Sequence, residues 1–306
     1  MHPVTRRTPL SRRLPWLLPV AVCVHKSRRY LQWWTSDVMW ATDRSPDPLP
    51  HEVMAHASVL LRELSPDVMH LQHAKVTNLR LAGPHVDGLL LRPGETFSFN
   101  RTVGNCTRRK GYVDGLRLAG GETGSGVGGG ICQIANMVHW LVLHSPLTVV
   151  ERSEHTVDPF PDAERVVPWG VGCSIVHNYV DLVVRNDTEL TFQLRVGVGG
   201  THLHGALLSD HPLEHRYRVE ARDERFERDR GTVHRSNEIW RVLLDPATGR
   251  TTGEELVRRN RAVVGYAPDP ARVVDVDARA QATTRPRNTT RTGRRSTDRS
   301  SRGSAS

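Results

Sequence analysis

Residues 124–130 limit what this chain of 306 residues can fold into, because five of the seven are glycine. Such a stretch supplies no side chains to a hydrophobic core, but it permits unusual backbone angles and the close approach of other groups. Residues 132–144, which follow, carry apolar side chains at helical spacing: Ile134, Ala135, Val138, Leu141 and Val142. The sequence therefore predicts a glycine-rich loop that leads into a central helix, with Cys132 at the mouth of that helix.

The segments around this helix indicate an α+β fold. Helical spacing predicts helices over residues 28–42, 51–64 and 71–83. Residues 87–99 contain a Pro-Gly turn between two short apolar runs, which is typical of strand, turn and strand. Further strands are expected at residues 147–152, 180–185 and 192–198, and then on to about residue 266. We expect N-terminal helices followed by a mostly antiparallel sheet packed on the central helix that begins at the glycine-rich loop.

Charge divides the chain into three parts. Residues 1–30, a basic N-terminal arm, hold seven Lys or Arg and no acid, and residues 279–306 hold eight Arg and one Asp. The net charge of +9 therefore comes from the two ends. We predict a globular domain over residues 31–268 and a disordered tail rich in Arg, Ser and Thr over residues 269–306. Basicity confined to the ends argues against specific nucleic-acid binding and favours peripheral contact of the termini with anionic lipid.

The N-terminal arm bears on the compartment. Residues 14–24 form an apolar run after a basic stretch, which resembles the start of a signal peptide. No small-x-small cleavage site follows, and eleven residues are too few to span a bilayer. We expect a cytoplasmic or membrane-peripheral protein, with export as the less favoured alternative.

Cofactor and metal patterns are weak. Gly124, Gly126 and Gly129 fit the dinucleotide pattern G-x-G-x-x-G, but no buried strand precedes them and no series of βαβ units follows. The four cysteines form no CxxC pair. Two pairs of histidines, His70 with His73 and His202 with His204, could each share one face of an element, but neither pair has obvious further metal ligands. We expect no cofactor and no metal.

The residues after the glycines indicate thiol chemistry. At the N-terminus of a helix, the positive end of the helix dipole and the unpaired backbone N–H groups favour a thiolate, so Cys132 is the candidate nucleophile. Gln133 is the candidate oxyanion donor and His155 the candidate base, with Asp158 or Asp181 orienting the imidazole. The alternative is that Cys132 is a small buried apolar residue, as most free cysteines are.

Six motifs occur in order: residues 75–79 (KVTNL), 93–98 (PGETFS), 110–115 (KGYVDG), 128–133 (GGGICQ), 150–152 with His155, and 178–182 (NYVDL). This series resembles the VanW family. The resemblance implies an accessory protein of vancomycin (glycopeptide) resistance, associated with the bacterial cell envelope and peptidoglycan, and it implies no particular reaction. Many relatives carry an acid in the segment matching residues 168–174, where this chain has Gly172 and Cys173. Asp158 or Asp181 would have to replace it.

Three hypotheses follow. The first is a cysteine-dependent hydrolase or transferase that acts on peptide or amide bonds of peptidoglycan or its precursors. The second is a non-catalytic module that binds a cell-wall fragment, a related peptide or a partner protein; backbone N–H groups of the glycine loop would cradle a carboxylate or phosphate. The loop glycines in question are Gly124, Gly126, Gly128, Gly129 and Gly130. The third is an interaction protein that docks through its basic ends.

Overall fold

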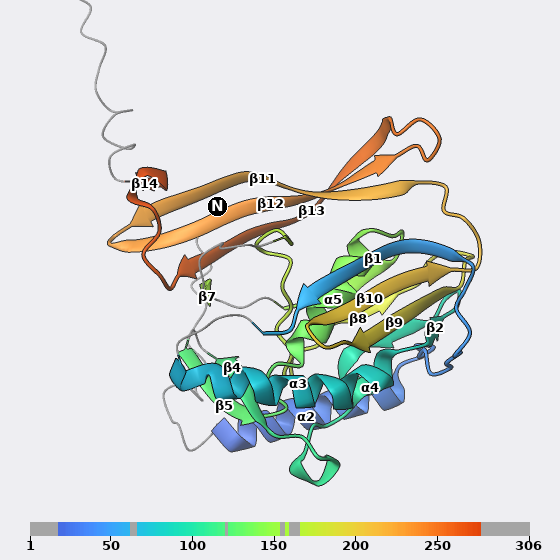
Figure 1. Ribbon diagram of the computed structural model, residues 1–306, viewed down its shortest axis with the longest axis horizontal. Coiled ribbons are helices and arrows are strands. Elements are labelled where there is room, and N and C mark those ends of the chain that lie inside the picture. Colours follow the sequence, from blue (N-terminus) through green and yellow to red (C-terminus); the bar gives the residue numbers. More distant parts are fainter. Residues whose placement is uncertain (1–17, 62–65, 120–121, 154–156, 159–165, 277–306) are drawn as a thin grey trace, which may run out of the picture.

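The computed structural model describes residues 18–61, 66–119, 122–153, 157–158 and 166–276. At its centre is an antiparallel sheet in the order β1-β10-β9-β2 (Figure 1). Its strands are β1 (His51–Val59), β2 (Leu89–Leu91), β9 (Phe192–Val198) and β10 (His202–Ser209). Helices α3 (Pro66–Val86) and α5 (Cys132–Leu143) pack on one face of this sheet, because the register partners Val196 and Gly205 lie against α3 and α5 respectively.

Helix α5 is the centre of the core. Nine of its twelve side chains are buried, from Ile134 to Leu143. A helix that is apolar on every side must be covered on every side. The main apolar cluster accordingly joins α5 to Leu79 of α3 and to Leu203 and Leu207 of β10.

Two small sheets complete the body. One has the order β3-β8-β6, from β3 (Thr96–Ser98), β6 (Thr148–Glu151) and β8 (Val183–Arg185). The other is the hairpin of β4 (Asp114–Ala119) and β5 (Glu122–Val127). The short helices α4 (Phe99–Val103) and η2 (Arg108–Lys110) connect β3 to this hairpin. Helix α2 (Leu18–Thr35) lies along the lower edge of the fold in Figure 1.

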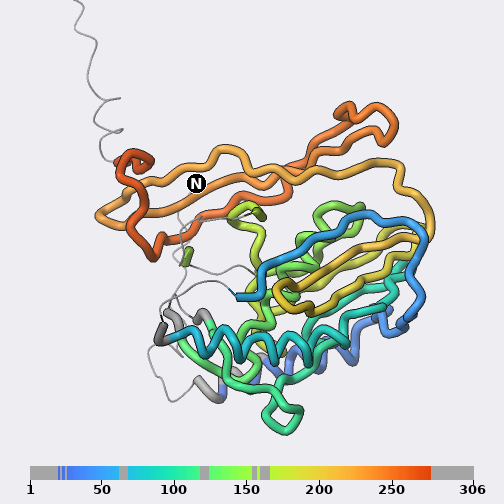
Figure 2. The backbone as a smooth tube through the Cα atoms, in the orientation of Figure 1, coloured from blue at the N-terminus to red at the C-terminus, as the bar shows by residue number. Residues whose placement is uncertain are grey.

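A sheet of long strands lies across the top of the body, as Figure 2 shows. Its strands are β11 (Arg216–Asp229), β12 (Thr232–Leu244) and β13 (Thr251–Val264), which pair antiparallel. Two short strands border them in parallel, β7 (Val157–Asp158) beside β13 and β14 (Val273–Asp275) beside β11. The turn η3 (Pro270–Arg272) leads into β14, so ordered structure continues past residue 268.

The predicted α+β class with mostly antiparallel sheets is confirmed. The central helix, the helix over residues 71–83 and the strands around residues 89–98, 147–152, 180–185 and 192–198 occur as predicted. The helix predicted over residues 51–64 is wrong, since residues 51–59 form β1. Eight of those residues pair with β10, and cross-strand packing of this kind overrides local helical spacing.

Two further boundaries differ from the prediction. The N-terminal helix spans Leu18–Thr35 instead of residues 28–42, and Trp40 beyond it forms a bridge to Thr96. Part of the predicted glycine loop is the strand β5, because Gly124 and Gly126 pair with β4. Glycine leaves room there for the Arg117 side chain, which lies against Gly126.

Candidate functional site

Cys132 is the first residue of α5, as the sequence predicts. Its side chain is half-buried, and its thiol donates to the Ile175 carbonyl at 4.0 Å. Burial raises the pKa of the Cys132 thiol, although the helix start was expected to lower it. A thiol that stays protonated at neutral pH is a weak nucleophile, so the start of α5 alone does not activate it.

The predicted partners of Cys132 are only partly within the described residues. Gln133 is in hydrogen-bond contact with β1, since its Nε2 donates to Ser58 Oγ at 3.0 Å and to the Val59 carbonyl at 2.9 Å. The amide that was expected to donate to an oxyanion therefore joins α5 to β1. His155 lies outside the described residues, and its pairing with Cys132 stays a prediction.

Asp158 forms a buried ion pair in the sheet of long strands. It accepts from Arg235 Nη1 at 3.0 Å, and both side chains are 2% exposed. The Arg235 guanidinium also lies over the Trp169 ring, 4.9 Å from its centroid. These contacts give Asp158 a structural role, because they join β7 to β12.

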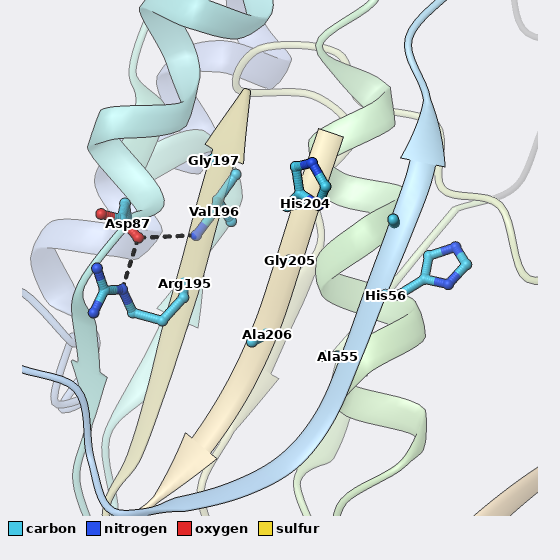
Figure 3. A pocket seen from close by; sticks show the side chains of 10 residues that line it. Ala55, His56, Asp87, Arg195, Val196, Gly197, His204, Gly205 and Ala206 are labelled. Carbon is cyan, nitrogen blue, oxygen red and sulfur yellow. Dashed lines mark hydrogen bonds and ion pairs between the residues drawn. The ribbon is translucent and has the colours of Figure 1, made fainter. Parts of the chain in front are cut away.

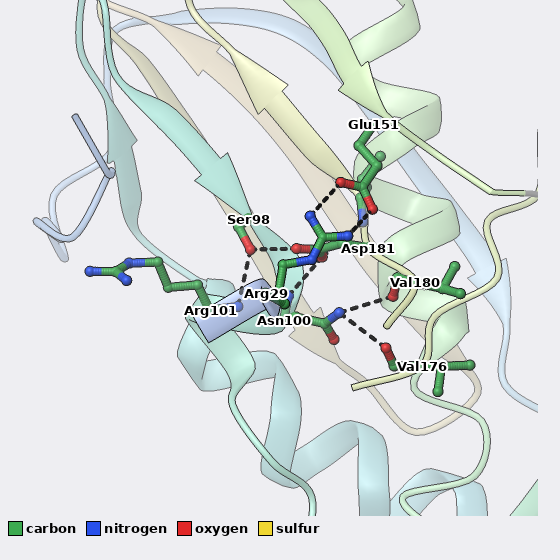
Figure 4. Close-up of polar contacts among 9 residues, drawn as sticks. Arg29, Ser98, Asn100, Arg101, Glu151, Val176, Val180 and Asp181 are labelled. Carbon is green, nitrogen blue, oxygen red and sulfur yellow. Dashed lines mark hydrogen bonds and ion pairs between the residues drawn. The ribbon is translucent and has the colours of Figure 1, made fainter. Parts of the chain in front are cut away.

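Asp181 belongs to a different network, at the start of α4 (Figure 4). It accepts from Ser98 Oγ at 2.5 Å and from the backbone N–H groups of Asn100 and Leu182 at 2.9 and 2.8 Å. Burial raises the pKa of Asp181 to about 6, although these three donors favour its charged form. Asn100 in turn donates to the carbonyls of Val176 and Val180. Asp181 thus positions the segment that carries Asn100.

The glycines before Cys132 accommodate the chain's own atoms. Gly128 and Gly130 have φ values of +75° and +92°, which disfavour any side chain. A Cβ on Gly128 would lie 2.6 Å from that of Cys106, and one on Gly130 would collide with Lys75. The Gly129 carbonyl accepts from Asn78 Nδ2 at 2.9 Å. Close packing against α3 and against Cys106 therefore explains these glycines without a ligand.

A cleft of about 640 Å³ lies between α2 and the chain around α4. Sequence reasoning did not select it, because its walls come from distant segments. Two sequence features could have indicated the cleft. One is the group of aromatic residues in the N-terminal helix, and the other is the set of polar residues that follow the motif at 93–98 and precede the motif at 178–182. The cleft is lined by Tyr30, Trp33, Trp34, Ala41, Thr42, Arg44, Asn100, Arg101, Thr102, Gly104, Asn105 and His177.

Two side chains of this cleft have uncommitted polar atoms. Both ring nitrogens of His177 and Nε1 of Trp33 are buried and have no hydrogen-bond partner in the part of the chain that the structure describes. Burial, with Lys26 and Lys110 nearby, lowers the pKa of His177, so its ring is neutral at pH 7 and holds one donor and one acceptor. An unsatisfied buried polar group costs about 1–3 kcal/mol, so a ligand that meets these atoms after a small rotation of the two side chains toward the cleft would gain affinity.

A second hollow, of about 550 Å³, lies on the open face of the four-stranded sheet (Figure 3). Alanines and glycines of β1, β9 and β10 form its floor. Its main charged groups are already paired, because Asp87 accepts from Arg195 Nε and from the Val196 N–H, both at 2.9 Å. This hollow is therefore a weaker candidate than the α2 cleft. Among the described residues, no group of three or more His, Cys, Asp or Glu is placed to hold a metal ion.

Comparisons with known proteins place the chain in context. Residues 74–208 match the family described as VanW like protein. "Vancomycin B-type resistance protein VanW" of Enterococcus faecalis (strain ATCC 700802 / V583) is 31% identical over 260 residues, which cover 85% of this chain and 94% of that protein. "Uncharacterized protein YoaR" of Bacillus subtilis (strain 168) is 35% identical over 125 residues, 39% of this chain and 41% of that protein. No solved structure matches the chain.

Proposed function

Because the chain belongs to the VanW family, we propose that it is an accessory protein of glycopeptide resistance that binds a cell-wall fragment or precursor in the α2 cleft. The link to resistance rests on the name of the Enterococcus faecalis relative, which this chain resembles over nearly its whole length. The observation that supports the binding site is the pair of uncommitted polar side chains, Trp33 and His177, at the border of an open cleft.

The chemistry of the cleft suits such a ligand. Three aromatic side chains of α2 provide flat apolar surfaces, and small-molecule sites combine such surfaces with a few convergent polar groups. Arg44 and Arg101 contribute positive charge, and the described lining includes no Asp or Glu. A carbohydrate ring with a carboxylate attached, as in peptidoglycan fragments, would place its ring on the aromatic wall and its charge near the arginines.

The alternative within the same family is a cysteine-dependent hydrolase or transferase that acts on peptide or amide bonds. It has weaker support, because the thiol of Cys132 has a raised pKa and the amide of Gln133 donates to β1. Asp158 and Asp181 are paired with other groups. We therefore favour binding without catalysis.

Calorimetric titration with the disaccharide-pentapeptide that muramidase releases from purified peptidoglycan would test the proposal. We expect saturable binding that weakens about tenfold in His177→Ala, since one hydrogen bond of about 1.4 kcal/mol is lost. Trp33→Phe keeps an aromatic ring but removes the N–H donor and part of the indole surface, so it should weaken binding by a comparable factor. His211→Ala, at an exposed histidine away from the cleft, is the matched control and should bind like the wild type.

The results of these titrations either support or exclude the α2 cleft as the binding site. If no peptidoglycan fragment binds, or if His177→Ala and His211→Ala bind equally well, the cleft is not the site. Mass spectrometry of the titrated fragment tests the alternative. Cleavage that disappears in Cys132→Ala would replace the binding proposal with the hydrolase.

A further inference from the structure

Helix α2 exposes an apolar stripe on its outer side. Val20, Val24, Leu31 and Trp34 are 56%, 60%, 55% and 84% exposed. At about 100° per residue, these four positions lie within about 80° of one another around the helix axis. Large apolar side chains that gather on one exposed face indicate an interaction surface.

An ion pair fixes which side of α2 faces outward. Arg29 lies about 180° from Val20 around the helix. Its guanidinium donates to both carboxylate oxygens of Glu151 in β6, at 2.7 and 2.6 Å, as Figure 4 shows. Paired donation of this kind restrains rotation of the helix. The apolar stripe is thus held toward the solvent.

Positive charge borders the stripe, since the exposed Arg28 of α2 lies about 40° beyond Val24 around the helix axis, and further charge lies on the cleft side of the helix. Arg108, Arg109 and Lys110 of η2 are exposed, although Arg108 pairs with Asp114. The Lys110 amine lies 3.5 Å from where a Cβ of Gly104 would stand, and Gly104 lines the cleft together with Tyr30 of α2. Helix α2 itself contains no acid, and residues 1–17 of the sequence add four Arg and no acid. The charge beside the stripe is complementary to an anionic surface.

We propose that the outer face of α2, together with the basic η2 loop, docks this protein on a bilayer surface that contains anionic lipid. An apolar helical stripe beside basic residues is what binds the boundary between headgroups and acyl chains, and Trp is favoured at that boundary. Within the described residues no helix has the length and apolar composition to cross a membrane, so α2 would lie in the membrane surface. Trp34, at one edge of the stripe, also lines the cleft, but Val20, Val24 and Leu31 do not, so this docking does not require a ligand in the cleft.

Sedimentation of the full-length protein with phosphatidylcholine vesicles, with and without phosphatidylglycerol, would test this. Leu31→Asp and Gln32→Asp form a matched pair, because both positions are exposed and both changes add one negative charge to α2. We expect binding only to anionic vesicles, and we expect Leu31→Asp to weaken it about fivefold more than Gln32→Asp, because only Leu31 buries apolar surface in the lipid. Arg109→Gln/Lys110→Gln should also weaken it, by about fivefold per charge.

Insertion of Trp34 into the lipid can be measured by quenching of tryptophan fluorescence. Lipids brominated in the acyl chains should quench the wild type, and Trp34→Phe should lose most of that quenching. Equal effects of Leu31→Asp and Gln32→Asp would overturn the docking face, since they would leave charge alone as the cause. Failure of the wild type to sediment with anionic vesicles would overturn the proposal as a whole. So would light scattering that shows a dimer which Leu31→Asp dissociates, because the stripe would then be a contact between two copies.

Discussion

Replacing Asp181 by Asn should remove a specific pH dependence from the stability of this protein. Asp181 is fully buried, and its pKa is raised from 3.8 to about 6. As pH rises above 4, the unfolded chain loses this proton while the folded protein retains it. The unfolded state then binds fewer protons, so the free energy of unfolding falls with rising pH. The stabilisation is fully present below pH 4 and is lost as pH passes 6.

The shift gives the size of the effect. About two pKa units at about 1.4 kcal/mol each correspond to about 3 kcal/mol between pH 4 and pH 7. Asn mimics the protonated acid, since its Oδ1 can still accept from the Asn100 and Leu182 N–H groups while its amide faces Ser98. The variant should therefore fold and lack this dependence.

Urea unfolding at intervals from pH 4 to pH 7, for wild type and Asp181→Asn, measures the difference directly. Every other titrating group is common to both proteins, so subtracting the two curves isolates Asp181. We expect the variant to gain stability relative to wild type as pH rises. A constant difference across this range would show that the three donors, and not burial, determine the pKa of Asp181, and the reasoning would fail.

Three further predictions concern other parts of the fold. Gly130→Ala should lower the free energy of unfolding by about 1–3 kcal/mol because of its φ of +92° and its contact with α3, whereas Gly124→Ala, with nothing within 4 Å, should change it little; thermal unfolding checks both. Asp158→Asn removes one of the two carboxylates that pair with the buried Arg235, the other being Glu224 at 2.6 Å, and should cost about 2–3 kcal/mol in urea unfolding; a loss below about 0.5 kcal/mol would contradict the ion pair's role. Iodoacetamide at pH 7 should label the exposed Cys23 quickly and the half-buried Cys132 far more slowly until the protein unfolds, as mass spectrometry would show; rapid labelling of Cys132 would favour the nucleophile hypothesis.

Local patterns predicted the parts of the fold that depend on local interactions. The spacing of apolar residues located α5, because a helix with nine of twelve side chains buried must be largely apolar. The segment over residues 51–59 was misassigned, because its pairing partner is β10, about 150 residues later in the chain. No local pattern within residues 51–59 indicates that β10 is the partner strand. Its apolar residues fit a helix nearly as well as a strand.

Local patterns were also insufficient to predict the candidate site. The glycines and Asp181 in the motifs were interpreted as parts of a reactive or ligand-binding site, yet the structure gives them structural contacts. Asn78 holds the Gly129 carbonyl, and Asp181 holds the start of α4. A residue type suits a reaction and a buried hydrogen bond equally well, and only the positions of its neighbours distinguish the two. The α2 cleft was missed because no single segment contains it.

The position of the cleft bears on how function is distributed in this family. The family match over residues 74–208 covers most of the core, including most of α3, all of α5 and the segments that carry Asn100 and His177. The aromatic wall of the cleft, with Tyr30 and Trp33, comes from α2 and lies outside that match. A protein that shared only the matched region would keep half of the cleft lining, without the apolar platform or the outer stripe. The interactions proposed here therefore depend on α2 and on the Arg29 ion pair that holds it in place, more than on the motifs that identify the family.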